Sequence, residues 1–141
     1  MTFNNPADHM IQKYLKESKN IAIVGLSNKP ERTSYRIARY LKEKGYQIFP
    51  VNPVLKGQQI LGVEVVGSLT EITVPIDIVD VFRRSEFLPE VAAEFIQTDA
   101  KVFWAQLGLE SEAAAKLLQA ANCQAIVMDK CIKIELEKFA L

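Results

Sequence analysis

Five short apolar runs constrain the fold of this chain more than any other feature of its sequence. They occupy residues 21–25, 46–51, 76–82, 101–105 and 124–128. The runs are rich in β-branched and aromatic residues, and they are apolar nearly throughout instead of alternating with polar residues. That pattern is typical of strands covered on both faces in a parallel sheet.

Helical patterns separate most of these runs. Apolar residues recur at helical spacing in three intervals: 35–41, 87–95 and 113–121. Lys44-Gly45 is a typical helix end, and two further helices are expected around residues 8–18 and 131–139. The interval after the second run is less regular. There we expect an extended piece around residues 60–66 and a turn of helix around 69–72 in place of a crossover helix.

Strands that alternate with helices imply right-handed βαβ units. The sequence therefore predicts an α/β fold with a doubly wound, mainly parallel five-stranded sheet and flanking helices. The 141 residues suffice for one sizeable core, and no internal repeat or linker divides them. We expect a single domain over residues 1–141.

The composition narrows the classes of function. Lys+Arg and Asp+Glu both number 17, so the broad basic surface of a nucleic-acid binder is not expected. No apolar run approaches the roughly 18 residues that span a bilayer, and the first residues do not resemble a secretory signal. Two cysteines, Cys123 and Cys131, fit a reducing cytosol, and one histidine, His9, argues against a zinc site. We expect a cytoplasmic protein without a metal, a nucleic acid or a membrane as partner.

The loops after the strands are the expected binding surface. In doubly wound sheets, ligands bind outside the carboxyl ends of the strands, near the switch in strand order. Five loops should share that edge: 25–34, 52–57, 82–85, 105–109 and 129–131.

The first loop contains one glycine, Gly25, where the dinucleotide fingerprint has three. Gly25 allows close approach of backbone to a ligand, and Ser27, Ser34 and the helix start suit a phosphate. Positive charge comes from Lys29, Arg32 and Arg36. The alternative is an ordinary βα turn whose helix is capped by Thr33 or Ser34.

The second loop has Asn52-Pro53 where dinucleotide-binding folds place an acidic residue that holds the ribose. With Lys56 nearby, this loop suits an adenine edge and an additional phosphate better than bare ribose hydroxyls. The alternative is a simple Asn-Pro turn.

Two arginines, Arg83 and Arg84, follow the third predicted strand. We expect one of them to point into the cleft and the other toward solvent or an acidic neighbour, with Asp80 as a partner. Ser85 is predicted to cap the next helix.

The last two loops contain residues expected to be structural as well as candidates for the cleft. Trp104 is expected to be buried, whereas Gln106 and Gly108 are candidates for the cleft. In the fifth loop, Asp129 is expected to cap the last helix, with Cys131 as an inert thiol.

A resemblance to a known family is carried by six segments: IAIVGLSNKPERTSYRIARYL, IFPVNP, ILGVEVVGSL, IDIVDVFRRSE, KVFWAQLG and VMDKCIKIE. In this order and spacing, over roughly residues 15 to 137, the chain resembles the stand-alone CoA-binding domain proteins. These are small relatives of the CoA-binding domain of the succinyl-CoA synthetase alpha subunit. The resemblance implies a Rossmann-like sheet that binds coenzyme A across its carboxyl edge.

The resemblance also implies a set of site residues. The pyrophosphate loop and the helix start after it would consist of Gly25, Ser27, Lys29, Ser34 and Tyr35. The adenosine end would lie near Asn52 and Pro53, and we add Lys56 as a contact of the 3′-phosphate. The wall along adenine and ribose would be Val81, Phe82 and Arg83, and the far side would be closed by Gln106, Leu107, Gly108, Lys130 and Cys131.

The larger synthetases add a phosphohistidine domain and an ATP-grasp partner, and the chain has no histidine beyond His9. We therefore expect a protein that binds CoA or acyl-CoA without catalysis of its own. A nicotinamide-dependent oxidoreductase is a second reading, disfavoured by the single Gly25 and the missing acidic residue. A CoA-binding subunit that docks on a separate ATP-grasp chain, a homo-oligomer, and a mixed disulfide between Cys131 and the CoA thiol are also left open.

Overall fold

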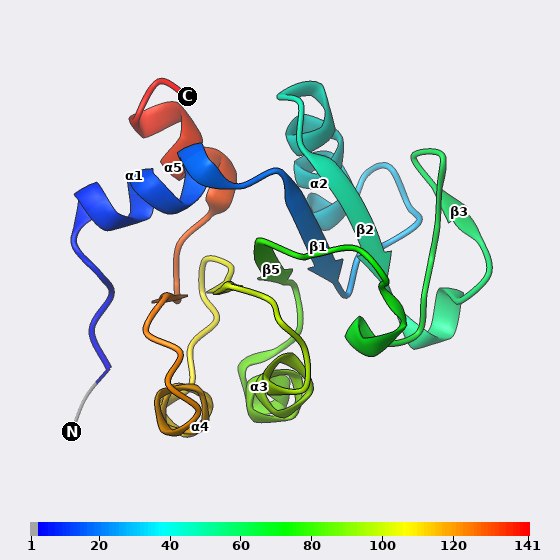
Figure 1. Cartoon of the computed structure of the whole chain (residues 1–141). Coiled ribbons are helices and arrows are strands. Elements are labelled where there is room, and N and C mark those ends of the chain that lie inside the picture. Colours follow the sequence, from blue (N-terminus) through cyan, green and yellow to red (C-terminus); the bar gives the residue numbers. More distant parts are fainter. Residues whose placement is uncertain (1–2) are drawn as a thin grey trace.

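The structure, a computed structural model, describes residues 3–141. Its centre is a parallel sheet in the order β2-β1-β5-β6-β7 (Figure 1). The strands are β1 (Asn20–Val24), β2 (Gln47–Val51), β5 (Ile78–Val81), β6 (Val102–Ala105) and β7 (Ile126–Val127). The residue range of each strand overlaps one of the five apolar runs, so the predicted doubly wound sheet is confirmed.

Helices cover both faces of this sheet (Figure 1). One face carries α1 (Asp8–Glu17), α2 (Thr33–Glu43) and α5 (Ile132–Lys138), and the other carries α3 (Leu88–Ile96) and α4 (Glu112–Ala120). All five predicted helices are present. Gly45 follows α2 with a φ of +101°, which confirms the predicted helix end.

The connection from β2 to β5 contains no α-helix, as expected from its irregular sequence. It consists of the 3-10 helix η1 (Pro53–Leu55), the antiparallel pair β3 (Gln59–Ile60) and β4 (Val63–Glu64), and the 3-10 turn η2 (Leu69–Glu71). Val66 also bridges Val51 in parallel, which ties this segment to the edge strand β2.

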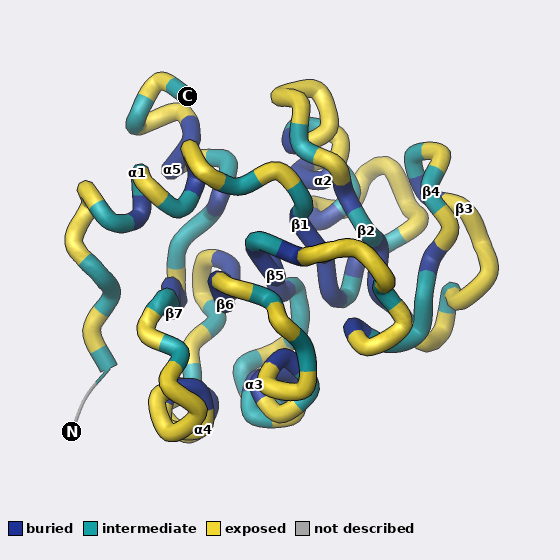
Figure 2. Tube along the Cα trace, in the orientation of Figure 1, coloured by how far each residue is buried: buried dark blue, intermediate teal, exposed yellow. Residues whose placement is uncertain are grey.

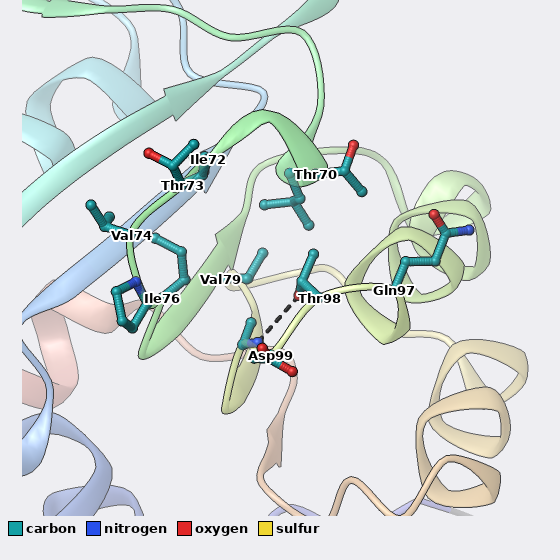
Figure 3. Close-up of a pocket in the computed structure, with 12 residues that line it drawn as sticks. Thr70, Ile72, Thr73, Val74, Ile76, Val79, Gln97, Thr98 and Asp99 are labelled. Atoms are coloured by element: carbon teal, nitrogen blue, oxygen red, sulfur yellow. Dashed lines mark hydrogen bonds between the residues drawn. The ribbon is translucent and has the colours of Figure 1, made fainter.

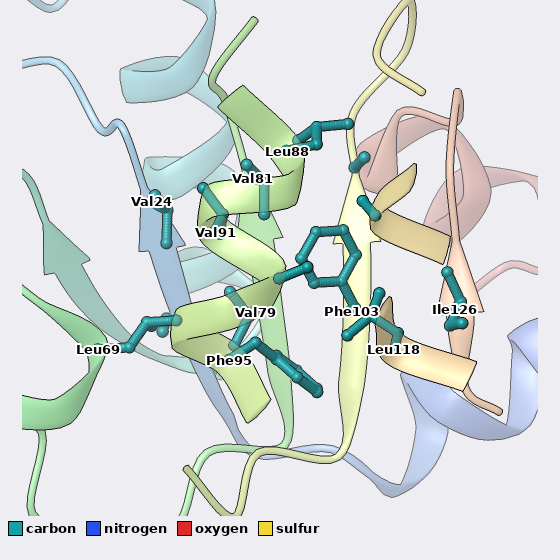
Figure 4. Packing of buried hydrophobic residues seen from close by; sticks show 14 of the residues in the cluster. Val24, Leu69, Val79, Val81, Leu88, Val91, Phe95, Phe103, Leu118 and Ile126 are labelled. Carbon is teal, nitrogen blue, oxygen red and sulfur yellow. The ribbon is translucent and has the colours of Figure 1, made fainter. Parts of the chain in front are cut away.

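The core lies in two layers, one on each side of the sheet, and the buried residues concentrate in the strands and on the helix faces turned toward them (Figure 2). Side chains alternate between the layers along each strand. In β5, Val79 and Val81 face α3 and α4, whereas Ile78 faces the opposite layer. Phe95 of α3 packs edge-on against Phe103 of β6, with ring centroids 5.6 Å apart (Figure 4).

Trp104 is fully buried, as predicted, in the layer of α1, α2 and α5. Its indole Nε1 donates a hydrogen bond of 2.8 Å to the carbonyl oxygen of Lys130. This bond satisfies the one polar group of the side chain, and it ties β6 to the loop after β7.

Two predicted helix caps are wrong. The N-cap of α2 is Arg32, without a side-chain hydrogen bond, and Ser34 lies inside the first turn. Ser85 opens the 3-10 helix η3 (Ser85–Phe87), whose N-cap is Arg84, and its Oγ accepts from the backbone N–H of Glu110. Each serine hydroxyl accepts a hydrogen bond from a neighbouring loop, Ser34 from Ser27 and Ser85 from Glu110. These partners, which the fold brings close, take the place of the amides of the serine's own helix.

No helix within residues 3–141 has the length and apolar character needed to cross a bilayer.

Candidate functional site

The strand order places a topological switch between β1 and β5. From β1 the chain passes to β2 on one side, and from β5 it passes to β6 on the other. The loops that follow the two strands therefore diverge and leave a crevice at the carboxyl edge, which is the usual ligand site of such sheets.

Two adjoining pockets occupy this edge. The first, called the loop pocket, has a volume of about 540 Å³ and is lined by Gly25, Ser27, Arg32, Thr33, Ser34, Asn52, Val54, Leu55 and Phe82. The second, called the apolar pocket, measures about 430 Å³ and is lined by Thr33, Ile37, Phe82, Arg83, Arg84, Gln106, Leu107, Leu109, Cys131 and Ile134. Thr33 and Phe82 line both, so the pockets adjoin, and together they are called the cleft.

The loop after β1 is held in shape by its own hydroxyl groups. Ser34 is buried, and its Oγ accepts from the N–H of Ser27 at 3.0 Å. The Oγ of Ser27 in turn accepts from the N–H of Lys29 at 3.1 Å. Gly25 takes a φ of +85°, and its N–H donates to the carbonyl of Val51. The shape of the loop is therefore fixed by hydrogen bonds within the chain itself.

The side chain of Asn52 shapes the far wall of the loop pocket. Its Oδ1 accepts from the N–H of Val54 at 3.0 Å, and its Nδ2 donates to the carbonyl of Leu26 at 3.1 Å. These bonds link the loops after β1 and β2 and cap η1. Val54 is left with 87 % of its surface exposed at the mouth of the pocket.

Lys56 is engaged elsewhere. Its Nζ lies 2.7 Å from Oε1 of Glu71, in the connection that leads to β5. The hydrogen bond from Lys56 lowers the pKa of the Glu71 carboxyl. Lys56 lines neither the loop pocket nor the apolar pocket.

Both arginines after β5 line the apolar pocket, and both approach the ring of Phe87. The Cζ atoms of Arg83 and Arg84 lie 4.5 Å and 5.7 Å from the ring centroid. Their guanidinium groups also approach carboxylates, Arg83 with Glu90 at 4.0 Å and Arg84 with Glu86 at 3.6 Å. The side chain of Arg83 is about two-thirds buried, whereas that of Arg84 is largely exposed.

The expected pairing of Asp80 with these arginines is wrong. Asp80 is fully buried in β5, and neither of its carboxylate oxygens has a hydrogen-bond partner. Because the period of a strand is two, Asp80 faces the same layer as Ile78, while the arginines follow in the loop. Burial raises the pKa of the Asp80 carboxyl well above its ordinary value of 3.8.

The last two loops are joined by hydrogen bonds that the sequence did not indicate. Oε1 of the buried Gln106 accepts from the N–H of Ile132 at 3.0 Å, so Gln106 caps α5. The predicted cap, Asp129, has a φ of +59°, and its Oδ1 accepts from the N–H of Gly108 at 2.7 Å. Cys131 is half-buried at the N-cap of α5 and lines the apolar pocket.

The cleft brings together about half of the candidate site residues. Those that line it are Gly25, Ser27, Ser34, Asn52, Phe82, Arg83, Gln106, Leu107 and Cys131. The lining does not include Lys29, Tyr35, Pro53, Lys56, Val81, Gly108 and Lys130. Val81 is fully buried in the opposite layer, and Tyr35 packs against the core beneath α2.

The structure adds lining residues that the sequence reasoning missed. They are Thr33, Ile37, Val54, Leu55, Leu109 and Ile134. Ile37 and Ile134 belong to the apolar patterns of α2 and α5, and only the packing of the two helices shows which apolar residues reach the cleft. The local signal in the sequence was the adjacent apolar pair Val54-Leu55 directly after Asn52-Pro53, in a loop expected at the carboxyl edge.

A third pocket, of about 330 Å³, lies at the opposite edge of the sheet, between the segment before β5 and the end of α3 (Figure 3). Its polar lining is largely threonine. Thr98 uses its Oγ1 within its own turn, donating to Phe95 and accepting from Ala100. The one titratable side chain in the lining is Asp99. This pocket offers little charge for a phosphorylated ligand, and the carboxyl edge is the stronger candidate.

The fold and the cleft at its switch point define a Rossmann-like α/β domain. The matching family model is described as a CoA binding domain, and it covers residues 19–137. The chain belongs to this CoA-binding domain family.

Comparisons with individual proteins agree with this family. YneT of Bacillus subtilis strain 168 is 51 % identical over 130 residues, which is 92 % of this chain and 94 % of YneT. A hypothetical protein from Pyrococcus horikoshii OT3 superimposes with a TM-score of 0.90 at 32 % identity, covering 100 % of both chains. The alpha subunit of the ADP-forming acetate–CoA ligase I of Pyrococcus furiosus is 34 % identical over 90 residues, 60 % of this chain but 19 % of that subunit.

Proposed function

We propose that this protein binds coenzyme A or an acyl-CoA in the cleft at the carboxyl edge, without a catalytic step of its own. The observation that carries the proposal is the union of two unlike pockets at Phe82. One offers hydroxyls, backbone amides and an arginine, and the other is walled mainly by apolar side chains. Coenzyme A has the same division, with a phosphorylated nucleotide at one end and a long uncharged arm at the other.

The pyrophosphate is proposed to lie over the loop after β1 and the start of α2. No side chain caps α2, so the amides of its first turn are left for a ligand or water. The helix dipole favours negative charge at the same point. Arg32 lines the pocket beside them and supplies a full positive charge.

The adenine is proposed to lie against Val54 and Leu55, the apolar part of the loop pocket. Covering the exposed Val54 would remove apolar surface from water. No carboxylate lines the loop pocket, because Asn52 occupies the position from which an acidic residue grips ribose hydroxyls in nicotinamide-dependent folds. This difference favours CoA over a nicotinamide dinucleotide.

The magnitudes are sufficient for useful affinity. A charge-assisted hydrogen bond to a partly desolvated phosphate contributes about 1.5–3 kcal/mol. Three or four such bonds, less the cost of association, correspond to binding in about the micromolar range.

Titration calorimetry with CoA, dephospho-CoA and NAD tests the proposal. We expect micromolar binding of CoA and much weaker binding of NAD. The variant Arg32→Ala should weaken CoA binding at least tenfold. Arg39→Ala, which removes an exposed charge of α2 outside the cleft, is the matched control. No heat with CoA at near-millimolar protein, or tighter binding of NADH than of CoA, would refute the proposal.

A second candidate function is that of a CoA-binding subunit in a split ligase. It is motivated by the match to the alpha subunit of the Pyrococcus furiosus ligase, whose own length is covered to only 19 %. Co-expression with ATP-grasp chains from the same genome, followed by an assay of ATP formation from ADP, phosphate and acetyl-CoA, tests this candidate. Activity that requires both chains would support this candidate. CoA binding without complex formation or activity would contradict it and would leave CoA binding as the function of this chain.

A further inference from the structure

We infer that the apolar pocket takes the acyl group of an acyl-CoA, so that thioesters with an uncharged apolar acyl chain bind more tightly than free CoA. This inference rests on the proposed function, because it assumes that the nucleotide end occupies the loop pocket. It goes further by assigning the class of the acyl group and the residues that select it.

The two pockets adjoin at shared residues. Thr33 and Phe82 line both pockets, so a ligand whose phosphates lie at the start of α2 can continue past the Phe82 ring without leaving the surface. The loop pocket contains the hydroxyls and the first-turn amides, whereas the cations beyond Phe82, Arg83 and Arg84, already lie near carboxylates of this chain. The part of the ligand that reaches the apolar pocket is therefore its uncharged end.

The far wall of the apolar pocket consists of large apolar side chains. Leu107 and Ile134 line the apolar pocket and keep 63 % and 51 % of their surface exposed. They come from the loop after β6 and from α5, and with Leu109 they form a wall without a titratable group. Large apolar side chains that meet at the open side of a pocket gain free energy when a ligand covers them.

The charged groups of the apolar pocket already have partners within the chain. The pocket includes Arg83 and Arg84, which could in principle select a carboxylated acyl group. Both guanidinium groups, however, lie against the Phe87 ring and near carboxylates of this chain, as described above. A carboxylate on the acyl group would have to compete with these partners and would lie against the leucine and isoleucine wall. An uncharged chain meets neither cost.

The size of the pocket fits this role. Its volume of about 430 Å³ lies within the range of small-molecule sites, so it can hold the sulfur end of the uncharged arm together with a short acyl chain. Each methylene that is fully buried should tighten binding about fourfold. From acetyl-CoA to butyryl-CoA, which differ by two methylenes, we therefore expect up to about a 15-fold gain in affinity.

The experiment measures dissociation constants for CoA, acetyl-CoA, butyryl-CoA, hexanoyl-CoA and succinyl-CoA by calorimetry. It uses the full chain and the variants Leu107→Ser and Leu117→Ser. Leu117 is a similarly exposed leucine on α4, outside the cleft, and serves as the matched control. We expect affinity to rise from CoA through acetyl-CoA to butyryl-CoA. Leu107→Ser should reduce the ratio of butyryl-CoA to CoA affinity at least threefold, and Leu117→Ser should preserve it.

The outcomes separate the inference from the proposed function. Equal affinity for CoA and every thioester would overturn the inference while leaving CoA binding intact. Tighter binding of succinyl-CoA than of butyryl-CoA would also overturn it and would assign selection to the arginines. Failure of CoA and of all thioesters to bind would refute the proposed function itself.

Discussion

Gly25 and Phe82 approach so closely that a Cβ atom on Gly25 would lie 2.8 Å from the carbonyl oxygen of Phe82. The two loops that flank the switch point therefore touch at backbone level. Phe82 lines both pockets, so this contact sets the position of the ring around which the proposed ligand bends.

The variant Gly25→Ala should lose both stability and CoA affinity. Alanine at a φ of +85° is strained, and its methyl group would push the loop away from Phe82. We expect a loss of about 1–3 kcal/mol in urea unfolding and at least a tenfold weaker CoA binding in calorimetry. Gly45→Ala is the control, because Gly45 also has a positive φ but would meet nothing within 4 Å. If Gly25→Ala binds CoA as the wild type does, the close approach is irrelevant to the cleft.

Ser34→Ala should weaken binding through the shape of the loop. The substitution leaves the N–H of Ser27 without the acceptor that now lies at 3.0 Å. A stability loss of about 1–2 kcal/mol is expected, with CoA affinity reduced severalfold. Ser111→Ala removes the N-cap bond of α4 and should cost about 1 kcal/mol without changing affinity. Equal affinities of the two variants would mean that the loop does not need Ser34 to hold a phosphate.

Asp80→Asn should stabilise the protein more at alkaline pH than at acidic pH. Burial raises the folded-state pKa of Asp80 above its ordinary value of 3.8. The protonated carboxyl therefore contributes its full share to the free energy of unfolding at pH values below 3.8. As pH rises toward the folded-state pKa, this contribution is lost, because the unfolded chain releases the proton first. The difference in free energy of unfolding between the variant and the wild type should therefore grow with rising pH, by up to about 1.4 kcal/mol per pH unit. Urea unfolding at several pH values between 5 and 8 measures it, and parallel stability curves would contradict it.

Lys56→Ala should leave the preference for CoA over dephospho-CoA within about twofold of the wild type. In this structure the Lys56 ammonium group is held 2.7 Å from Glu71, away from the lining of the cleft. The ratio of the two dissociation constants, measured by calorimetry, is the readout. A tenfold fall in the preference for CoA would instead indicate that Lys56 contacts the 3′-phosphate, as its position after Asn52-Pro53 had suggested.

The architecture could be predicted because its signals are periodic and local. Continuous apolar runs indicated the strands of the parallel sheet, and the topology rule then placed the loops of Gly25, Asn52 and Phe82 on one edge. The irregular connection after β2 was equally visible, because its sequence contains no sustained helical pattern.

The side-chain partnerships could not be predicted in the same way. The amide of Ile132 is capped by Gln106, which is 26 residues away, and not by the nearby Asp129. Asp80 precedes two arginines by only a few residues, but it is fully buried in β5 whereas they follow in the loop, near Glu90 and Glu86. In both cases tertiary packing decides the outcome: it gives the amide of Ile132 a distant partner, and it buries Asp80 without one.

The bond between Trp104 and the carbonyl of Lys130 gives the molecule an internal optical reporter. The chain contains one tryptophan, so its fluorescence comes from a single buried indole. That indole is fastened to the residue before Cys131, which lines the apolar pocket. A ligand bound in the apolar pocket should therefore change the tryptophan fluorescence of the unlabelled protein, and this change would report pocket occupancy during a titration.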